Sequence, residues 1–449
     1  MTNKIQKIMK YIKFIYITLL FVGAVEAQEE TISKAEAVQM ALENNYGIKI
    51  ADNNLKISEN NKSIYNSGFL PTLTGNAGAT YNLDNSEVTF LPRLMLDPIT
   101  ANGAESSRYN ASMNLNYTLF DGLGRRYNYK QLKEQYNLTE LQARETIENT
   151  LLQLFGVYYN VAKLSEDVSL MNQSLKISKD RLERVQYQFE YGQINKLAVL
   201  NAEVDVNNDS INLLNTQQLL ANSKRDLYVV LGKTEVPNFS VDTLVTFSLQ
   251  SDKTTLFEKV KANNVTLQQL EKNILISDFQ LKSNKSGYLP SIGLTGTYGW
   301  NKNNNNSTSQ VTTSVNTGLS GGINLTWNIF DGGSTRTRVQ NAKINVDTQR
   351  LQKQQVELEV NRDFNNAYDD YLNKLFILQT QEKNVQTNTD NFNRTEERFK
   401  LGQITSIEFR QAQLNLINAK NAKNSAKYDA KLAELEVLQV SGDLLNTDF

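Results

Sequence analysis

Apolar and polar residues alternate in four segments of the chain, which fall into two pairs. The first pair covers residues 72–83 and 110–120, and the second covers 291–300 and 315–330. The apolar face of the first segment carries Leu73, Gly75, Ala77, Ala79, Tyr81 and Leu83, and that of the last carries Val315, Leu319, Ile323, Leu325, Trp327 and Ile329. A period of two over about ten residues predicts a β-strand, so we expect two strand pairs.

The opposite face of these predicted strands consists of Asn, Ser, Thr and Gly. An apolar face, a face of small polar residues and aromatic residues such as Trp300 near the ends are typical of transmembrane β-strands. Two hairpins of a soluble sandwich are the alternative, but the small polar face suits a water-filled lumen better than a packed surface. A polar segment at about 84–108 and an Asn-rich segment at 301–310 are predicted to be loops.

Two stretches without proline, residues 121–190 and 332–400, are predicted to form one long helix each. A helix of about seventy residues is about 105 Å long. In the first stretch, seam positions recur every three or four residues: Leu154, Val157, Val161, Leu164, Val168, Met171, Leu175, Ser178, Leu182, Val185 and Phe189. In the second, Tyr371, Leu378, Val385, Phe392 and Phe399 recur every seven residues. Both patterns predict coiled-coil packing.

Shorter helices are predicted on either side of each strand pair and long helix. One precedes each strand pair, over about 33–67 and from 254, and one follows each long helix, over 195–231 and 405–441. Their lengths, roughly 33 and roughly 37 residues, add up to that of the long helix. We therefore expect them to stack end to end beside it, with segment 233–253 at mid-height.

The chain contains an internal duplication, because the same landmarks recur in the same order. They are Asn44-Asn45 and Asn263-Asn264, Gly68–Pro71 and Gly287–Pro290, the Phe-Asp-Gly sequences ending at Gly122 and Gly332, Tyr158 and Tyr368, the Gly-Gln-Ile turns at 192–194 and 402–404, and Gly232 and Gly442. An ordered set of this kind is implausible as coincidence. We therefore divide the chain into a first repeat, 28–232, a linker or equatorial segment, 233–253, and a second repeat, 254–449.

Composition excludes several classes of function. The chain of 449 residues has neither cysteine nor histidine, so thiol and imidazole catalysis, disulfides and the usual zinc sites are excluded. Its 47 basic and 48 acidic residues give no basic surface for nucleic acid. No nucleophile–base arrangement is visible among the remaining residues. The sequence predicts no enzyme and no cofactor.

Residues 1–27 are predicted to be a signal peptide. Four lysines precede an apolar run from Phe14 to Val22, and Val25 and Ala27 occupy the small-residue positions of a cleavage site. An uncleaved membrane anchor is the alternative, but the run is short for a helix that must span a membrane. No cysteine follows the cleavage site, which excludes an N-terminal lipid anchor.

Four strands are too few to close a membrane barrel, which needs about eight, and open sheet edges are not tolerated in lipid. The chain must therefore form oligomers. Two copies would give eight strands and a lumen filled by side chains, which conflicts with the small polar face. Three copies would give twelve strands, so we expect a homotrimer.

The duplicated layout and its landmarks resemble the TolC-like outer-membrane efflux protein family over essentially the whole mature chain. The resemblance implies an α+β membrane protein whose trimer has a twelve-stranded transmembrane barrel, four strands per chain, continued by a long α-helical coiled-coil tunnel. It implies an outer-membrane protein that extends into the periplasm and passively conducts substrates from an inner-membrane pump, reached through a periplasmic adaptor (membrane fusion) protein. A periplasmic coiled-coil adaptor or structural protein that bridges the envelope is the alternative.

The resemblance also implies roles for particular residues. Adaptor docking would use the two helix–turn–helix tips, at Tyr191, Gly192 and Gln193 and at Leu401, Gly402 and Gln403. Relatives often carry an acid six residues after the turn glycine, which lines the periplasmic aperture. This position is Glu408 in the second repeat and Ala198 in the first. A helix C-cap glycine and a solvated surface glutamate are the alternatives.

Asp121-Gly122 and Asp331-Gly332 lie where a predicted strand turns into a long helix. An aspartate there can satisfy free N–H groups at the helix N-terminus and complement the helix dipole. We expect a structural role for these four residues and no chemistry.

Overall fold

The computed structural model describes residues 30–234, 239–249 and 252–447. The predicted signal peptide lies outside the described residues. The chain forms two compact units, each assembled from separate stretches. The second unit comprises Asp52–Gln142 and Thr266–Leu358, and the first comprises the remaining described residues, with Ala143–Val265 at its centre. Both predicted repeats therefore contribute to both units.

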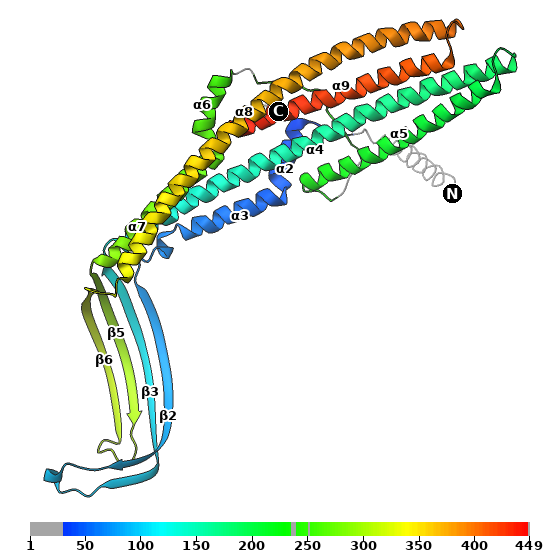
Figure 1. Cartoon of the computed structure of the whole chain (residues 1–449). Coiled ribbons are helices and arrows are strands. Elements are labelled where there is room, and N and C mark those ends of the chain that lie inside the picture. The colour runs from blue at the N-terminus through cyan, green and yellow to red at the C-terminus, as the bar shows by residue number, and fades with distance from the viewer. Residues whose placement is uncertain (1–29, 235–238, 250–251, 448–449) are drawn as a thin grey trace, which may run out of the picture. The chain divides into compact units, whose positions relative to one another are not determined.

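The second unit contains one antiparallel sheet with the strand order β2-β3-β5-β6 (Figure 1). The strands are β2 (Thr72–Val88), β3 (Ile99–Phe120), β5 (Ser291–Asn304) and β6 (Thr313–Thr326). The pairing of β3 with β5 joins the two repeats in one sheet. β2 and β6 are the two edges, and each has one open side in the single chain.

The predicted polar loop at 84–108 is wrong. β2 continues to Val88 and β3 begins at Ile99, so the loop is only 89–98. Its tip is apolar and exposed, with a short 3₁₀ helix, η2 (Pro92–Leu94), at its centre. In the parts of β2 and β3 that lie within the predicted loop, Ser, Asn and Glu occur on both faces of the strands. The alternation of apolar and polar residues is therefore lost there, although β2 and β3 still pair.

The loop of the second hairpin is also shorter than predicted. β5 continues to Asn304 and β6 begins at Thr313, which leaves residues 305–312 as the loop. β6 ends at Thr326, four residues before the predicted end at 330. Asparagine side chains extend this hairpin: Asn304 bonds Ser107 of β3 and Asn303 bonds Ser314 of β6.

The two long helices are α4 (Gly124–Glu190) and α8 (Ser334–Lys400), of 67 residues each. At 1.5 Å per residue, each is about 100 Å long. In the second unit, α7 (Val265–Lys285) precedes the short 3₁₀ helix η3 (Ser286–Tyr288) and then β5. Among the described helices, none has the length and apolar character needed to cross a membrane.

The first unit contains two helical hairpins (Figure 1). The remainder of α4 continues into α5 (Lys196–Val230), and the remainder of α8 continues into α9 (Ser406–Val440), which leads to η4 (Leu444–Asn446). Two shorter helices complete the unit: α2 (Lys34–Asn44) and α6 (Lys253–Asn263). A parallel pair of three-residue strands, β1 (Glu30–Ile32) and β4 (Phe239–Val241), lies in this unit as well. The sequence pattern did not predict this pair.

The predicted single helix over 33–67 is wrong. The structure has two helices, α2 and α3 (Tyr46–Asn61), separated at Asn45, and the segment closes with a 3₁₀ turn, η1 (Ile64–Asn66). Asn264 makes the equivalent break between α6 and α7. The Asn45 side chain donates to the carbonyl of Val230 over 2.8 Å, and Asn264 donates to Val440 over 2.9 Å. Each asparagine therefore holds the last turn of the helix that precedes the repeat's closing glycine.

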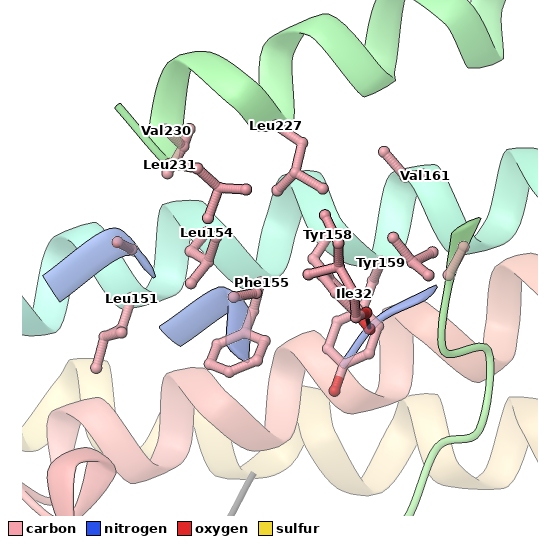
Figure 2. Close-up of a cluster of buried hydrophobic side chains, with 14 of the residues drawn as sticks. Ile32, Leu151, Leu154, Phe155, Tyr158, Tyr159, Val161, Leu227, Val230 and Leu231 are labelled. Atoms are coloured by element: carbon pink, nitrogen blue, oxygen red, sulfur yellow. Dashed lines mark hydrogen bonds between the residues drawn. The ribbon is translucent and has the colours of Figure 1, made fainter. Parts of the chain in front are cut away.

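The core of the first unit lies around the middle of α4 (Figure 2). Leu154 and Val161, two seam residues of the predicted heptad, are fully buried, as are Phe155 and Tyr158. Leu227 of α5 and Leu231, which caps that helix, pack onto them, and Ile32 of β1 lies beside Tyr158 (Figure 2). The heptad pattern predicted the burial of Leu154 and Val161 correctly, did not include Phe155 and Tyr158, and is wrong at Phe189, which is 39% exposed.

Two buried polar side chains attach segment 239–249 to this core. Tyr158 donates its hydroxyl hydrogen to the carbonyl of Ile32 and accepts from the N–H of Asp242. Burial raises the pKa of Tyr158 to about 12, so the hydroxyl remains a donor at neutral pH. The Glu434 carboxylate of α9 accepts from the N–H groups of Ser248 and Leu249, both over 2.6 Å. The segment thus bridges α4 and α9.

Candidate functional site

Each long helix ends at a glycine turn, and both turns lie in the first unit. Two hydrogen bonds close each turn: Gln193 N–H to Gln188 C=O (2.8 Å) and Gly192 N–H to Phe189 C=O (2.9 Å), then Gln403 N–H to Arg398 C=O (2.9 Å) and Gly402 N–H to Phe399 C=O (3.0 Å). This pair of bonds is the Schellman motif, which satisfies the last carbonyls of a helix. The two repeats therefore build the same C-terminal cap.

The conformation of these turns explains their glycines. Gly192 has φ 72° and Gly402 has φ 73°, in the left-handed region that side chains disfavour. A Cβ atom at either position would meet no other heavy atom within 4 Å. The glycine is required by the turn and not by a close neighbour, and the turn itself is open to solvent.

The two turns differ in how the next helix begins. In the first, the Asn195 side chain accepts from the N–H of Ala198 over 3.2 Å. In the second, Thr405 accepts from the N–H of Glu408, and the Glu408 carboxylate returns to accept from the N–H of Thr405 over 2.8 Å. This reciprocal pair is a capping box, which satisfies two free donors of the helix start.

Glu408 is fully solvent-exposed at the start of α9. Hydrogen bonds from the backbone and side chain of Thr405 lower its pKa, so the carboxylate is charged at neutral pH. The geometry thus gives Glu408 a structural partner and also leaves a negative charge at the tip. Ala198 gives the first turn neither.

Large apolar side chains surround both turns without being covered. Tyr191 is 79% exposed and Leu401 is 71% exposed. Leu197 and Ile407, in the first turns of α5 and α9, are similarly open. Large exposed apolar side chains that gather at one end of a molecule are typical of a protein-binding surface.

An open groove of 1090 Å³ lies between the two tips, lined by residues of all four helices of the hairpins. Ile194, Glu408 and Arg410 are among its lining residues. Phe399 of α8 also lines it and stacks on Phe409 of α9, with the ring centroids 4.7 Å apart. The lining of the groove therefore combines apolar side chains with charged ones.

A buried ion network joins the two hairpins beside this groove. Arg410 of α9 donates to both carboxylate oxygens of Asp209 of α5, over 2.7 and 2.8 Å. Ser178 of α4 donates to the same carboxylate over 2.5 Å. Arg181 of α4 pairs with Asp205 of α5 and also donates to the carbonyl of Ser406. The network therefore connects α4 and α5 to the start of α9.

The Asp209–Arg410 pair stabilises its own charges. Burial raises the pKa of Asp209, but the hydrogen bonds from Arg410 and Ser178 outweigh burial and lower the pKa overall. Burial lowers the pKa of Arg410, and the bonds to Asp209 outweigh it and raise the pKa overall. Both groups are charged across the physiological range, so the pair holds as an ion pair.

Sequence reasoning missed Arg181, Asp205, Asp209 and Arg410. The available signal was Ser178, a polar residue in an otherwise apolar seam. Ser178 is fully buried and needs a polar partner, which Asp209 provides. The partner could not be identified from the sequence because it lies on another helix.

The strand–helix corners lie in the second unit. The Asp121 carboxylate accepts from the N–H of Arg125 over 2.9 Å, at the first turn of α4. The Asp331 carboxylate accepts from the N–H of Thr335 over 2.8 Å, at the first turn of α8. Gly122 and Gly332 both have positive φ, of 66° and 68°. The geometry is that of two helix N-caps, each beside a left-handed glycine.

The residues that the structure describes contain no cluster of acidic side chains suited to hold a metal ion. The groups gathered at the tips are instead apolar side chains, exposed carboxylates that include Glu408, and a network of paired charges. This arrangement offers a surface for binding another protein and a charged rim.

Comparison with known proteins gives the family. The family model described as outer membrane efflux protein matches residues 37–233 and 256–443. The outer membrane efflux protein BepC of Brucella suis biovar 1 is 21% identical over 430 residues, covering 93% of this chain and 86% of the relative. The outer membrane protein TolC of Vibrio cholerae is 23% identical over 394 residues, covering 85% of this chain and 84% of the relative.

Solved structures agree on the fold. The Campylobacter jejuni CmeC outer membrane channel superposes with a TM-score of 0.75 at 17% identity, over 92% of this chain and 86% of that chain. The outer-membrane channel OprN superposes with a TM-score of 0.73 at 16% identity, over 91% of this chain and 89% of that chain. Because the family model covers each repeat almost completely, the chain belongs to the outer membrane efflux protein family.

Proposed function

We propose that three copies of this chain form the outer-membrane duct of a tripartite efflux or export system. The duct conducts substrates passively from an inner-membrane pump, across the periplasm and the outer membrane. Family membership supports an efflux channel and does not support the alternative of a periplasmic adaptor or structural protein. The trimer is supported by the surfaces that a single chain leaves without a partner, namely the edges of the sheet and the exposed stripes of two helices.

The first such surface is the sheet. β2 and β6 each have an open edge, and open edges are not tolerated in lipid. Pairing β2 of one copy with β6 of the next would close the ring. Leu73, Leu319 and Ile323 are 64%, 81% and 71% exposed, as expected of a lipid-facing surface. Three copies supply twelve strands, enough to leave a water-filled lumen between the polar faces.

The second surface is a pair of exposed helix faces. On α5, exposed apolar residues follow one seven-residue register, with steps of three, four, seven and three positions: Leu197, Leu200, Val204, Ile211 and Leu214. On α8, Leu351, Leu358 and Leu372 lie on one seven-residue register and are also exposed. A heptad stripe without a partner is a coiled-coil seam that requires another helix. Helices of neighbouring copies would cover both stripes and close a helical tunnel.

The third surface is the pair of tips. We assign adaptor docking to Tyr191, Gly192 and Gln193 and to Leu401, Gly402 and Gln403. The exposed apolar side chains and the groove between the tips support this role. The adaptor would link the duct to the inner-membrane pump.

We also assign an aperture role to Glu408. Three copies would place three exposed carboxylates at the periplasmic end of the tunnel, where a ring of negative charge attracts cations. The capping box fixes the direction of each carboxylate. Asp121, Gly122, Asp331 and Gly332 are given a structural role at the strand–helix corners, supported by their capping bonds.

Membrane fractionation followed by reconstitution tests the proposal. The protein is expected in the outer-membrane fraction, and the purified protein is expected to conduct ions across a planar bilayer. Recovery in the soluble periplasmic fraction, without conductance, would favour the adaptor alternative and contradict the duct.

A further inference from the structure

The β2–β3 hairpin extends well beyond the rest of the sheet. The pairing of β3 with β5 ends at Ser107 and Asn304, so Ile99–Ser106 pair with β2 alone. Residues 86–101 lie beyond the register shift of the two strands, sixteen residues in all, so the end of the hairpin can lie at most eight residues, about 26 Å, from that shift. We call residues 84–105 the arm and residues 90–98, at its end, the tip.

The arm changes direction where it leaves the sheet. The register of β2 and β3 shifts between Asp84 and Ser86, and Gly103 has φ 66° and donates its N–H to the Asn85 side chain over 2.8 Å. A bulge with a left-handed glycine bends a hairpin strongly. Figure 1 shows the arm running across the end of the sheet, beyond β5 and β6. The tip therefore lies toward the β6 edge.

The tip is apolar and uncovered in the single chain. Leu91, Leu94, Met95 and Leu96 are all more than half exposed, and Met95 is 95% exposed. An exposed group of large aliphatic side chains at the end of a hairpin is unfavourable in water and marks a contact surface. Arg93 lies among them and makes no ion pair or hydrogen bond with any residue that the structure describes.

The charges of the arm favour one occupant. Asp84, Glu87, Asp97 and Glu105 are acidic and Arg93 alone is basic, so the arm carries a net charge of −3, from four negative and one positive. Asp84, Glu87 and Glu105 lie outside the tip, whereas the tip itself carries Arg93 and Asp97 and has no net charge. The three carboxylates on another copy's arm would attract Arg93 of the tip.

We infer that the tip of each arm docks on the arm of the next copy, in a head-to-tail ring around the outer mouth of the barrel. This inference rests on the proposed trimer. A closed barrel of twelve strands, about 4.8 Å apart and tilted by about 40°, has a radius of about 12 Å. On that circle, equivalent points of a threefold ring lie about 21 Å apart. The arm is long enough to reach its neighbour, and it bends toward the edge at which the neighbour's β2 would pair.

Photo-cross-linking in the intact outer membrane tests the inference. p-Benzoylphenylalanine is introduced in place of Met95, and in a control in place of Ser309 in the shorter β5–β6 loop. Two differently tagged copies are expressed together, and the cross-linked peptides are mapped by mass spectrometry. The Met95 position is expected to cross-link to residues 84–105 of another copy, and the Ser309 position is not. Arg93→Glu should lower the Met95 yield about threefold, while Arg93→Lys should keep it.

A native gel of the same samples separates this inference from the proposed function. A trimer in which the Met95 position links only within its own chain or to lipid would overturn the ring of arms and leave the duct intact. A monomer without intermolecular cross-links would overturn both.

Discussion

Gly232 and Gly442, which close α5 and α9, invite comparison with Gly192 and Gly402 at the tips. All four have φ near 70° and close their helices with the same two hydrogen bonds. At the tips, a Cβ atom would meet nothing within 4 Å. At Gly232 and Gly442 it would lie 2.4 Å from the backbone carbonyl oxygens of Asn44 and Asn263. A helix-closing glycine thus lies at an open surface at the tips and at a tight contact between helix ends at Gly232 and Gly442.

The difference explains how stability is distributed in the first unit. Because Gly232 and Gly442 have no Cβ atom, the carbonyl groups of Asn44 and Asn263 can pack directly against them. Asn45 and Asn264 donate hydrogen bonds to the same turns. The tips carry exposed side chains and are held by the Asp209–Arg410 network some distance along the helices. Substitutions at the junction should therefore affect folding, and substitutions at the tips should affect binding.

The largest effect is expected from Gly442→Ala. The new Cβ meets a backbone carbonyl, which cannot rotate away, and the left-handed conformation adds further strain, so we expect a loss of about 4 kcal/mol in folding stability. Thermal unfolding of the detergent-solubilised protein by circular dichroism measures it. Gly402→Ala is the matched control, because it shares the conformation and lacks the clash, and should cost about 1 kcal/mol. Equal losses in the two variants would refute the distinction.

Asp209→Ala is expected to have the next largest effect. It removes the two short hydrogen bonds between Arg410 and the buried Asp209 carboxylate and leaves Arg410 with the longer, 3.6 Å ion pair to Asp205, which costs about 3 kcal/mol. Hydrogen exchange should report faster opening of α9 near Phe409, and Asp209→Leu combined with Arg410→Met should recover part of the loss. If the double variant is no better than Asp209→Ala, the network is not what joins the hairpins.

The same pair predicts a pH dependence. The folded pKa of Asp209 is lowered, so its contribution is fully present above the ordinary aspartate pKa of about 3.9. It is lost as the pH falls through the lowered folded value. As the pH is lowered through this range, the wild type should therefore lose a part of its free energy of unfolding that Asp209→Asn does not lose. An identical acid limb in both proteins would contradict this contribution.

Leu401→Asp should leave the fold nearly unchanged and weaken adaptor binding. The side chain is 71% exposed, so the change in folding stability should stay within about 0.5 kcal/mol. A charge in the centre of an apolar docking surface should reduce affinity about tenfold, measured by co-purification with the cross-linked adaptor. Full binding by the variant would remove Leu401 from the docking surface.

Glu408→Gln should have the smallest structural effect. Glutamine can keep the capping box with Thr405 while it removes the charge. Cation selectivity in planar bilayers should fall, whereas the helix content should stay the same. Glu408→Ala, which reproduces Ala198 of the first repeat, removes the cap as well and separates the two contributions. Unchanged selectivity in Glu408→Gln would leave only the structural role.

The sequence predicted the elements whose signals are local and periodic. The strands alternate with a period of two, the long helices carry a seven-residue stripe, and the duplicated landmarks gave the repeats. The heptad residues Leu154, Tyr371 and Phe399 are buried as expected. These features depend on near neighbours in sequence and on one repeated face.

What the sequence could not give depends on contacts between distant residues. Asn45 sits in a helix-compatible stretch, and its break is set by the carbonyl of Val230, far along the chain. The β2–β3 arm has lost its alternation, and only the pairing of its two strands defines it. Asp209 and Arg410 are ordinary surface residue types until two hairpins bring them together.

Native mass spectrometry of the protein extracted from outer membranes tests the central claim most directly. The unpaired sheet edges and helix stripes predict a complex of three times the mass of the mature chain. A monomer that keeps its folded structure after gentle extraction would contradict the account, because its open edges and stripes would then need no neighbouring copy.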